Sequence, residues 1–421
     1  MKKILIIGAG ISGLTAAYRL QSEGYDVTIV ESSKVPGGWV RTLVDPNEGN
    51  IEKGPQLIAV ESGTPLRYLL DSLGIPLTIH RNLSRFIGID GKLVRVPRSV
   101  SELFSSPLLT LKGKLRIFLE PLLCYFLNKN KEYTLHEAIG NRFGFEIADR
   151  LAPAIVNGIL AAPPNEVSQE SIPLFRMANE GSVLWRSIMR GHTVLSTPTG
   201  GMGELTQALA SKCSIIFNTE ITSLNYSQSY WHASGPTYDG KFDSILLAIP
   251  APKAAALLSL ISPRLSSILK KIEYTSLYSF HSTHAYNNTL DNSLGFLLHP
   301  SESEFLLGCF VSSSLTIPDK DKTIKLRTFV KINQNSIPRW QDIYSELIKW
   351  VPDLSPSNSC HIETASLAIP IMRVGQFPEI VRALEDLPSG LDWIGGARFG
   401  PGVKDIVDGI DSWMSTSRMH A

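Results

Sequence analysis

The chain begins with apolar runs separated by glycines, and this pattern predicts a β-α-β unit. Ile4-Leu5-Ile6-Ile7 is a short, mostly β-branched run of the kind that forms a buried parallel strand. From Leu14 to Ser22 the apolar positions recur at helical spacing, and Gly24 stands where such a helix would end. Residues 27–30 form a second apolar run. We therefore expect an α/β sheet to begin at the N-terminus.

Two later stretches have patterns of their own. Residues 61–190 are expected to be mostly helical, with candidate helices at 66–73, 107–127 and 134–151. Residues 251–385 are expected to form an α+β unit. It mixes two helices with alternating segments that predict an antiparallel sheet, at 276–286, 305–311 and 324–332.

Composition narrows the class of protein. At 421 residues the chain exceeds what one core usually supports, so two or three lobes are expected. Forty basic and 39 acidic side chains give a net charge of +1, so no overall field draws the protein to nucleic acid. The four cysteines are scattered without metal-ligand spacing, which predicts no metal site and a reducing compartment. The run at 4–7 is too short for a signal peptide, and no apolar stretch reaches the ~18 residues of a spanning helix, so a cytoplasmic protein is expected.

A glycine-rich turn between the first predicted strand and helix has the pattern of a dinucleotide site. Its residues are Gly8-Ala9-Gly10-Ile11-Ser12-Gly13, a G-x-G-x-x-G sequence. Gly8 permits the turn, Gly10 lets the backbone approach a pyrophosphate, and Gly13 lets helix and strand pack closely. The helix N-terminus offers free N–H groups to the phosphates. Glu31 lies eighteen positions after Gly13 and suits a ribose diol, with Ser32 beside it. The pattern predicts FAD or NAD.

The segment after Glu31 distinguishes between these two cofactors by resemblance. Pro36-Gly37-Gly38-Trp39-Val40-Arg41-Thr42 resembles the E-x(5)-G-G-x-x-x-T signature of the amine-oxidase-like flavoproteins. That resemblance implies FAD, with the glycine pair against the diphosphate and Arg41 close to a phosphate. It also implies a Rossmann-type FAD domain assembled from residues 1–60, 191–250 and 386–421, the last piece beginning a helix near Val403. The chain has no cysteine near its C-terminal flavin segment, so the FAD is expected to be non-covalent.

Further segments resemble one branch of that superfamily, the protoporphyrinogen and coproporphyrinogen III oxidases. Gly37 to Thr42 resembles the branch's G-G-W-I-R-S/T element, and Glu52-Lys53-Gly54-Pro55 resembles its E-x-G-P loop beside the flavin. Other matches follow in order along the chain, at 85–92, 118–121, 143–144, 158–162, 200–202, 368–370 and 395–405. The chain departs from the branch at Gln56, at Ala162-Pro163, at Ile371-Met372 and at Gln376, which indicates a divergent bacterial member.

The resemblance implies a set of site residues. Arg85 would pair with a propionate of the substrate, and the backbone of Gly158 would lie near the substrate. Ile221 is expected in a strand whose backbone touches adenine. Beyond the glycine-rich turn, Glu31 and Ser32, the cofactor residues would be Gly38, Trp39, Arg41, Gly54, Pro55, Gln56, Leu57, Ile221, Gly396, Pro401, Gly402 and Val403.

No catalytic side chain is assigned, because no nucleophile triad, metal cluster or carboxylate pair emerges and the flavin would carry the chemistry. The resemblance implies six-electron oxidation of protoporphyrinogen IX to protoporphyrin IX in haem synthesis, in three hydride steps with oxygen as the expected electron acceptor. Proton release needs no dedicated base. His192 and His361 are candidates for one, but a lone histidine is more often structural.

Several alternatives remain open at this stage. The closest is oxidation of coproporphyrinogen III, which carries four carboxylates in place of two. A cavity with a second cluster of arginines would favour that substrate. A cavity with one cation at an otherwise apolar entrance would favour protoporphyrinogen. Another amine-oxidase-like enzyme, or a flavin-binding protein without turnover, is also compatible with the sequence.

The partners implied are few. Residues 108–126 combine large apolar side chains with three cations, Lys112, Lys114 and Arg116, a pattern that predicts peripheral contact with the cytoplasmic face of the inner membrane. The family resemblance further implies that the product passes to ferrochelatase.

Overall fold

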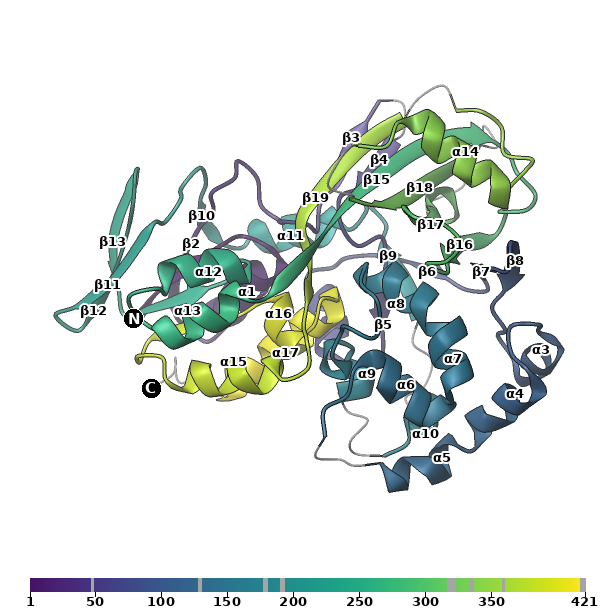
Figure 1. The fold of residues 1–421 in the computed structure, drawn as a ribbon. Coiled ribbons are helices and arrows are strands. Elements are labelled where there is room, and N and C mark those ends of the chain that lie inside the picture. The colour runs from purple at the N-terminus through teal and green to yellow at the C-terminus, as the bar shows by residue number, and fades with distance from the viewer. Residues whose placement is uncertain are drawn as a thin grey trace.

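A computed structural model of the 421-residue chain was analysed (Figure 1). It describes residues 1–46, 49–127, 131–176, 181–189, 194–315, 323–332, 337–357 and 360–416.

A five-stranded parallel sheet forms one half of the molecule, in the order β10-β2-β1-β14-β20. The strands are β10 (Ser214–Ile216), β2 (Asp26–Val30), β1 (Lys3–Ile7), β14 (Ser244–Leu247) and β20 (Leu391–Trp393). Segments far apart in the sequence thus share one sheet. The boundaries proposed for the discontinuous domain stay a prediction.

Both faces of this sheet are covered, which explains the uninterrupted apolar run in β1. Ile4 and Ile6 belong to an apolar cluster with residues of α1, α11 and α17, whereas Leu5 and Ile7 belong to a second cluster with residues of α12, α13 and α15. These helices are α1 (Ile11–Ser22), α11 (Gly203–Ala210), α17 (Val403–Thr416), α12 (Ala251–Leu257), α13 (Pro263–Lys270) and α15 (Gln376–Glu385).

A seven-stranded sheet forms the upper right of Figure 1, in the order β19-β15-β18-β17-β16-β7-β8. Its strands are β19 (Cys360–Ile371), β15 (Glu273–Ala285), β18 (Thr323–Lys331), β17 (Leu306–Val311), β16 (Ser293–Leu298), β7 (Ser84–Ile89) and β8 (Lys92–Arg95). The three predicted strand segments are confirmed. Among the described residues of 251–385 the strands pair antiparallel, as predicted. The strand β16 also pairs in parallel with β7, which comes from the stretch expected to be mostly helical. The helix α14 (Trp340–Trp350) packs its apolar side on this sheet.

Helices fill the lower right of Figure 1, and two of the predicted ones are interrupted. The predicted helix at 107–127 breaks after α4 because Leu119 caps it and Pro121 cannot continue it. The predicted helix at 134–151 breaks at Gly144, whose φ is 101°. The helices are α3 (Val100–Ser105), α4 (Leu111–Phe118), α5 (Glu120–Leu123), η1 (Cys124–Phe126), α6 (Leu135–Phe143), α7 (Phe145–Arg150), α8 (Ala152–Leu160), α9 (Pro173–Arg176) and α10 (Val183–Met189).

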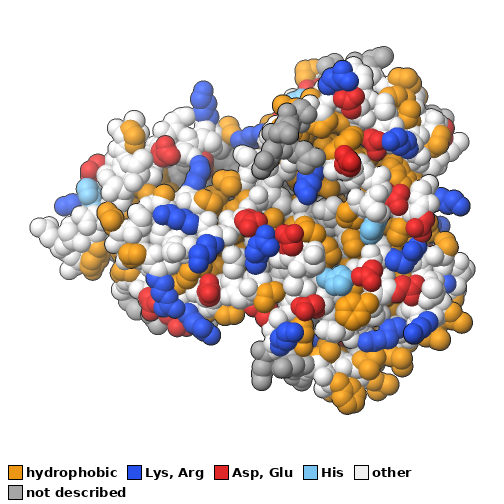
Figure 2. All heavy atoms as spheres, in the orientation of Figure 1, with side chains coloured by type: hydrophobic (Ala, Val, Ile, Leu, Met, Phe, Trp, Pro, Cys, Tyr) orange, Lys and Arg blue, Asp and Glu red, His pale blue; other side chains and the backbone are white. Residues whose placement is uncertain are grey.

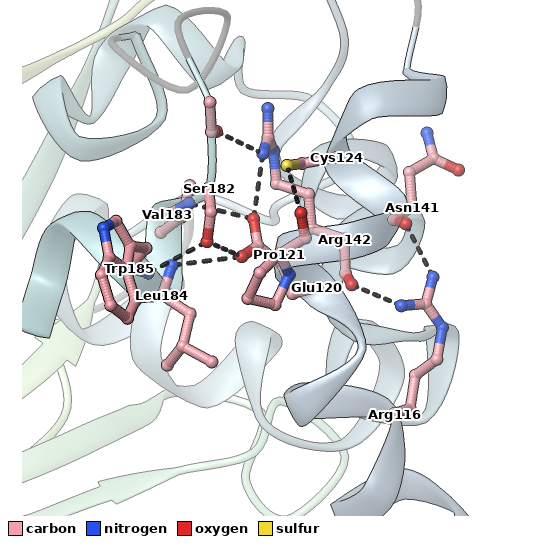
Figure 3. Close-up of polar contacts among 11 residues, drawn as sticks. Arg116, Glu120, Pro121, Cys124, Asn141, Arg142, Ser182, Val183, Leu184 and Trp185 are labelled. Atoms are coloured by element: carbon pink, nitrogen blue, oxygen red, sulfur yellow. Dashed lines mark hydrogen bonds and ion pairs between the residues drawn. The ribbon is translucent and has the colours of Figure 1, made fainter.

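A buried ion pair joins three of these helical segments (Figure 3). The carboxylate of Glu120, with no exposed surface, accepts hydrogen bonds from Arg142 Nη1 at 3.1 Å and from the backbone N–H of Val183 at 2.9 Å. It also accepts from the N–H of Leu184 at 3.3 Å and from the hydroxyl of Ser182. The carboxylate therefore ties α5 to α6 and to the start of α10.

Smaller elements connect these parts. The antiparallel strands β11 (Ser223–Ser227), β12 (Tyr230–Gly235) and β13 (Tyr238–Phe242) project at the left of Figure 1. The remaining elements are β3 (Thr42–Asp45), β4 (Gly49–Glu52), β5 (Ile58–Val60), α2 (Pro65–Ser72), β6 (Leu77–His80), η2 (Gln169–Ser171), β9 (Val194–Pro198), η4 (Ser312–Leu315) and α16 (Gly396–Phe399).

Candidate cofactor and substrate site

The glycine-rich turn has the geometry that its sequence predicts. Gly8 has a φ of 106°, and its N–H donates to the carbonyl oxygen of Val30 at 2.8 Å. A Cβ on Gly13 would overlap the carbonyl oxygen of Gly8, so helix and strand pack closely only with glycine there. A Cβ on Gly10, by contrast, would meet no heavy atom within 4 Å. The space in front of Gly10, at the N-terminus of α1, is open to a phosphate.

The carboxylate of Glu31 lies at this turn. Its Oε2 accepts a hydrogen bond from the N–H of Ala9 at 2.7 Å, and its Oε1 accepts from the N–H of Ser33 at 2.8 Å. Ser32 is exposed beside it. The backbone of Thr219 donates to the carbonyl oxygen of Glu31 at 2.9 Å, which brings the segment before β11 alongside. The segment contains Ile221, which is buried but lies in the connection between β10 and β11, so the expectation of a strand there is wrong.

The second glycine pair meets the turn directly. Gly37 donates from its N–H to the carbonyl oxygen of Ala9 at 2.7 Å, and a Cβ on Gly38 would lie 3.3 Å from the Cα of Gly10. Arg41 follows in the same segment, and its Nε is buried without a hydrogen-bond partner among the described residues. A buried guanidinium nitrogen needs a hydrogen-bond acceptor, and a phosphate oxygen can supply one. The residues present therefore fit a dinucleotide diphosphate at the turn.

The loop at 52–57 packs against the same segment. A Cβ on Gly54 would overlap the carbonyl oxygen of Trp39, so glycine is required by close contact. Trp39 is half-buried, and its Nε1 donates to the carbonyl oxygen of Leu367 at 3.3 Å. Pro55, Gln56 and Leu57 are also half-buried. Gln56 donates from Nε2 to Ser312 Oγ at 2.7 Å, and its Oε1 is buried without a donor among the described residues, which leaves an acceptor for a ligand.

Two buried ionisable side chains hold this loop, Arg327 and Glu52. The sequence did not point to Arg327, and it pointed to Glu52 only as part of the E-x-G-P element. Arg327 of β18 donates from Nη1 to the carbonyl oxygen of Gly54 at 2.6 Å and from Nη2 to that of Lys53 at 3.2 Å. Burial lowers the pKa of Arg327 to about 10, against the opposing effect of Glu52 and Glu363. A lone arginine among apolar strand residues was the available signal, but its partners lie far away in sequence.

Glu52 is the second of these side chains. Burial raises its pKa to about 7, although it accepts hydrogen bonds from the N–H of Met202 at 2.9 Å and from Thr42 Oγ1. Thr42 Oγ1 in turn accepts from the N–H of Gly203 at 2.8 Å. The glutamate of the E-x-G-P element therefore links the loop to the start of α11 rather than facing a ligand.

The C-terminal segment joins the same core. Val403, at the start of α17, shares an apolar cluster with Ala9 and Ile11. Gly402 donates from its N–H to Asp405 Oδ2 at 3.1 Å, and Gly396 begins α16, with a Cβ there 3.6 Å from the Cα of Pro401. The structure thus brings the N-terminal turn and the C-terminal candidates into one region.

The two substrate candidates lie in different surroundings. Arg85, on β7, is exposed and lines a pocket. Gly158, on α8, is half-buried, and a Cβ there would overlap the side chain of Leu297 on β16. Packing therefore accounts for the glycine at 158 without any ligand. Its role near the substrate, like that of Arg85, stays a prediction.

Two histidines of the seven-stranded sheet, His361 and His281, lie close to each other. His361 contacts Glu363 at 2.8 Å and Asp45 at 3.4 Å, and its ring lies 6.2 Å from that of His281. Burial and the neighbouring Arg327 lower the pKa of His281 to about 2, so its ring is neutral. His192 lies outside the described residues. The described residues contain no group of three His, Cys, Asp or Glu side chains arranged to hold a metal ion.

Comparison with known proteins identifies the family of this site. Residues 11–316 match the flavin containing amine oxidoreductases. Protoporphyrinogen oxidase of Nicotiana tabacum is 31% identical over 177 residues, which is 40% of this chain but only 34% of that enzyme. The human protoporphyrinogen oxidase is 26% identical over 76% of this chain and 74% of its own length. Coproporphyrinogen III oxidase of Bacillus subtilis is 25% identical over 66% of this chain and 65% of its own length.

Solved structures share the fold over the whole chain. A crystal structure from Exiguobacterium, described as a candidate protoporphyrinogen oxidase, superposes with a TM-score of 0.82 at 20% identity, covering 100% of this chain and 99% of that one. Cyclohexylamine oxidase of Brevibacterium oxydans superposes with a TM-score of 0.77 at 18% identity, with the same coverage. Identities this low show a common fold, and the fold alone does not select a substrate.

Proposed function

This chain belongs to the family of flavin-containing amine oxidoreductases and is an FAD-dependent enzyme, and from that premise we propose that its substrate is a porphyrinogen. Protoporphyrinogen IX is the leading candidate and coproporphyrinogen III the second. The human protoporphyrinogen oxidase and the Bacillus subtilis coproporphyrinogen III oxidase align with this chain at 26% and 25% identity. The observation that carries the proposal is the position of Arg85, which lines a pocket that a hydrogen-bond chain joins to the cofactor loop.

The residues of the chain have distinct tasks in this proposal. The turn at Gly10, the N-terminus of α1 and Arg41 hold the diphosphate, and Glu31 holds a ribose. Arg327 and Glu52 hold the loop at Gly54 in place through hydrogen bonds. Bound FAD supplies the hydride acceptor. The protein binds the substrate, orients one saturated carbon toward the cofactor and excludes water from that contact.

The proposal predicts a simple outcome with the two porphyrinogens. The purified protein should convert one or both into a fluorescent porphyrin, and anaerobic addition of the same compound should bleach the flavin. Both measurements are needed, since flavin bleaching without porphyrin fluorescence would show that a compound other than the porphyrinogen reduces the flavin. A yellow protein that neither bleaches nor produces porphyrin would contradict the proposal and leave a flavin protein with another role. The ratio of kcat/KM for the two substrates decides between them.

We also propose that the helices at the lower right contact a membrane surface. Large apolar side chains are exposed there, including Leu122 at 64%, Tyr125 at 74% and Phe126 at 85%. Phe118 of α4 stacks on Phe104 of α3, with ring centroids 5.9 Å apart. Figure 2 shows apolar side chains gathered at this edge of the molecule. No helix among the described residues is long and apolar enough to cross a membrane.

The cations expected to meet lipid phosphates are mostly engaged elsewhere. Lys114 Nζ donates to the carbonyl oxygen of Phe104 at 2.8 Å and is buried. Arg116 donates to the carbonyl oxygens of Arg142 at 2.6 Å and Asn141 at 2.8 Å. Lys112 alone of the three is exposed. The sequence-based expectation is therefore wrong for two of the three cations, and apolar burial is the main attraction that this face offers.

A vesicle assay tests this prediction. The protein should bind neutral phosphatidylcholine vesicles, with little loss at high salt, because few lysines or arginines face the lipid. Replacing Leu122 and Phe126 by serine should weaken binding by up to about 10²- to 10⁴-fold, since each buried apolar side chain contributes roughly 1.5–3 kcal/mol at most. Leu260→Ser is the matched control, because Leu260 is 94% exposed on another part of the chain. Binding that needs anionic lipid, or a dimer that dissociates in the double variant, would contradict the membrane proposal.

A further inference from the structure

A pocket of about 310 Å³ lies where β6, β7, β9 and β16 approach one another beside the turn after β8. Its lining residues come from all five of these segments. They are His80, Asn82, Leu83, Arg85, Val96, Pro97, Arg98, Leu195 and Leu294.

Two arginines, Arg85 and Arg98, line this pocket. Arg98 Nη1 donates to the carbonyl oxygen of Asn82 at 2.8 Å, and the backbone N–H of Arg98 donates to Glu102 Oε2 at 2.8 Å, so the residue is fixed at both ends. Neither Arg98 nor Arg85 forms a side-chain ion pair with the described residues. None of the nine lining residues is acidic. The pocket lining therefore contains two arginines and no acidic residue, and Glu102 contacts Arg98 through the backbone N–H of that residue.

The rest of the pocket is uncharged. Five of the lining residues are apolar: Leu83, Val96, Pro97, Leu195 and Leu294. His80 is also uncharged near neutral pH, because burial lowers its pKa below the usual value. The lining suits an apolar molecule with anionic groups along one edge. A small inorganic anion would leave the apolar wall unused.

A chain of hydrogen bonds joins the pocket to the cofactor loop. The ring of His80 contacts Thr197 Oγ1 at 2.9 Å, and Thr197 Oγ1 donates to the carbonyl oxygen of Gln56 at 3.2 Å. Gln56 directly follows Gly54-Pro55. The charged pocket and the cofactor loop are thus built on the same group of residues.

We propose that this pocket binds two carboxylates of one apolar ligand, with Arg85 and Arg98 each pairing with a different carboxylate. Arg98 is then a second specificity-determining residue for the reaction. This inference rests on the proposed function, since a porphyrinogen with propionates on neighbouring pyrrole rings presents such an edge. Guanidinium pairs with carboxylates in a two-point geometry that lysine cannot reproduce.

A double-mutant cycle tests the assignment. Arg85→Ala and Arg98→Ala should each raise KM about 10- to 100-fold, the cost of losing one charge-assisted pair. Together they should raise it by the product of the two factors, because independent contacts add in free energy. FAD content should not change. Arg95→Ala is the matched control, since Arg95 is an exposed arginine on β8 that does not line the pocket. A double variant no worse than Arg85→Ala would overturn the assignment of two carboxylates.

Binding without turnover supplies an independent measurement. The fluorescence of the product porphyrin should fall when it binds the oxidised wild type. Its dimethyl ester should bind the wild type more weakly, by a factor similar to that by which the free acid binds the double variant more weakly. Arg98→Lys should recover only part of the affinity. If the wild type oxidises neither porphyrinogen but binds the diacid through both arginines, the proposed function fails and the pocket assignment stands. If turnover is present and Arg98→Ala behaves as wild type in both assays, only the pocket assignment fails.

Discussion

Replacing Gly10 with valine should abolish FAD binding and leave the fold intact. Gly10 has φ −73° and ψ 177°, an extended conformation that valine adopts without strain. A Cβ there meets no heavy atom of the described chain within 4 Å, so the apoprotein has room for it. The same space is the one that the diphosphate needs at the N-terminus of α1. The variant should therefore be colourless after purification.

Thermal unfolding separates loss of cofactor from loss of fold. Saturating FAD at about 1,000 times its Kd should stabilise the wild type by about 4 kcal/mol and the Gly10→Val variant not at all. Without FAD the two proteins should unfold within about 0.5 kcal/mol of each other. Gly13→Ala is the informative contrast, because its Cβ would overlap the carbonyl oxygen of Gly8 and should damage the apoprotein itself. A yellow Gly10→Val protein would show that the diphosphate lies elsewhere.

The cofactor turn was predictable because its physics is local. Gly8, Gly10 and Gly13 each have a role set by a conformation or a contact within the same β-α-β unit. The residues that support the turn from outside were not predictable in this way. Arg327 reaches Gly54 across 273 positions of sequence, and only the fold of the seven-stranded sheet brings the two together.

The proposed substrate pocket is a second example of contacts that the sequence alone does not reveal. Arg85 was found through a resemblance, whereas Arg98 is an ordinary basic residue until the fold places it beside Arg85 in one pocket. Strand order was equally hidden, since the parallel pairing of β16 with β7 leaves no mark in either segment's alternation. Lys114 and Arg116 were misassigned because a cation's sequence position does not reveal that it bonds backbone carbonyl oxygens.

Glu120→Ala should destabilise the helical part of the chain by about 3–5 kcal/mol, because the substitution removes the carboxylate that forms an ion pair with the buried Arg142. Arg142 is 4% exposed and Glu120 has no exposed surface, so water cannot replace the lost carboxylate. The N–H groups of Val183 and Leu184 would lose their acceptor as well (Figure 3). Asp149→Ala is the control, because Asp149 pairs with His136 at the surface with 63% of its side chain exposed, a contact worth less than about 1 kcal/mol.

The loss of stability in Glu120→Ala should be confined to the helical region, and measuring where it occurs is the decisive test. All the partners of Glu120 shown in Figure 3 lie in the helical region, so the Glu120→Ala protein should still bind FAD while hydrogen exchange accelerates in α5, α6 and α10. Vesicle binding should fall with it, because α5 carries Leu122 of the exposed apolar face. Adding Arg142→Met should recover part of the lost stability, since it removes the buried charge that Glu120 neutralises in the wild type. If Glu120→Ala unfolds no earlier than Asp149→Ala, the pair is not what holds these helices together, and packing of α6 and α8 in their apolar cluster must do so instead.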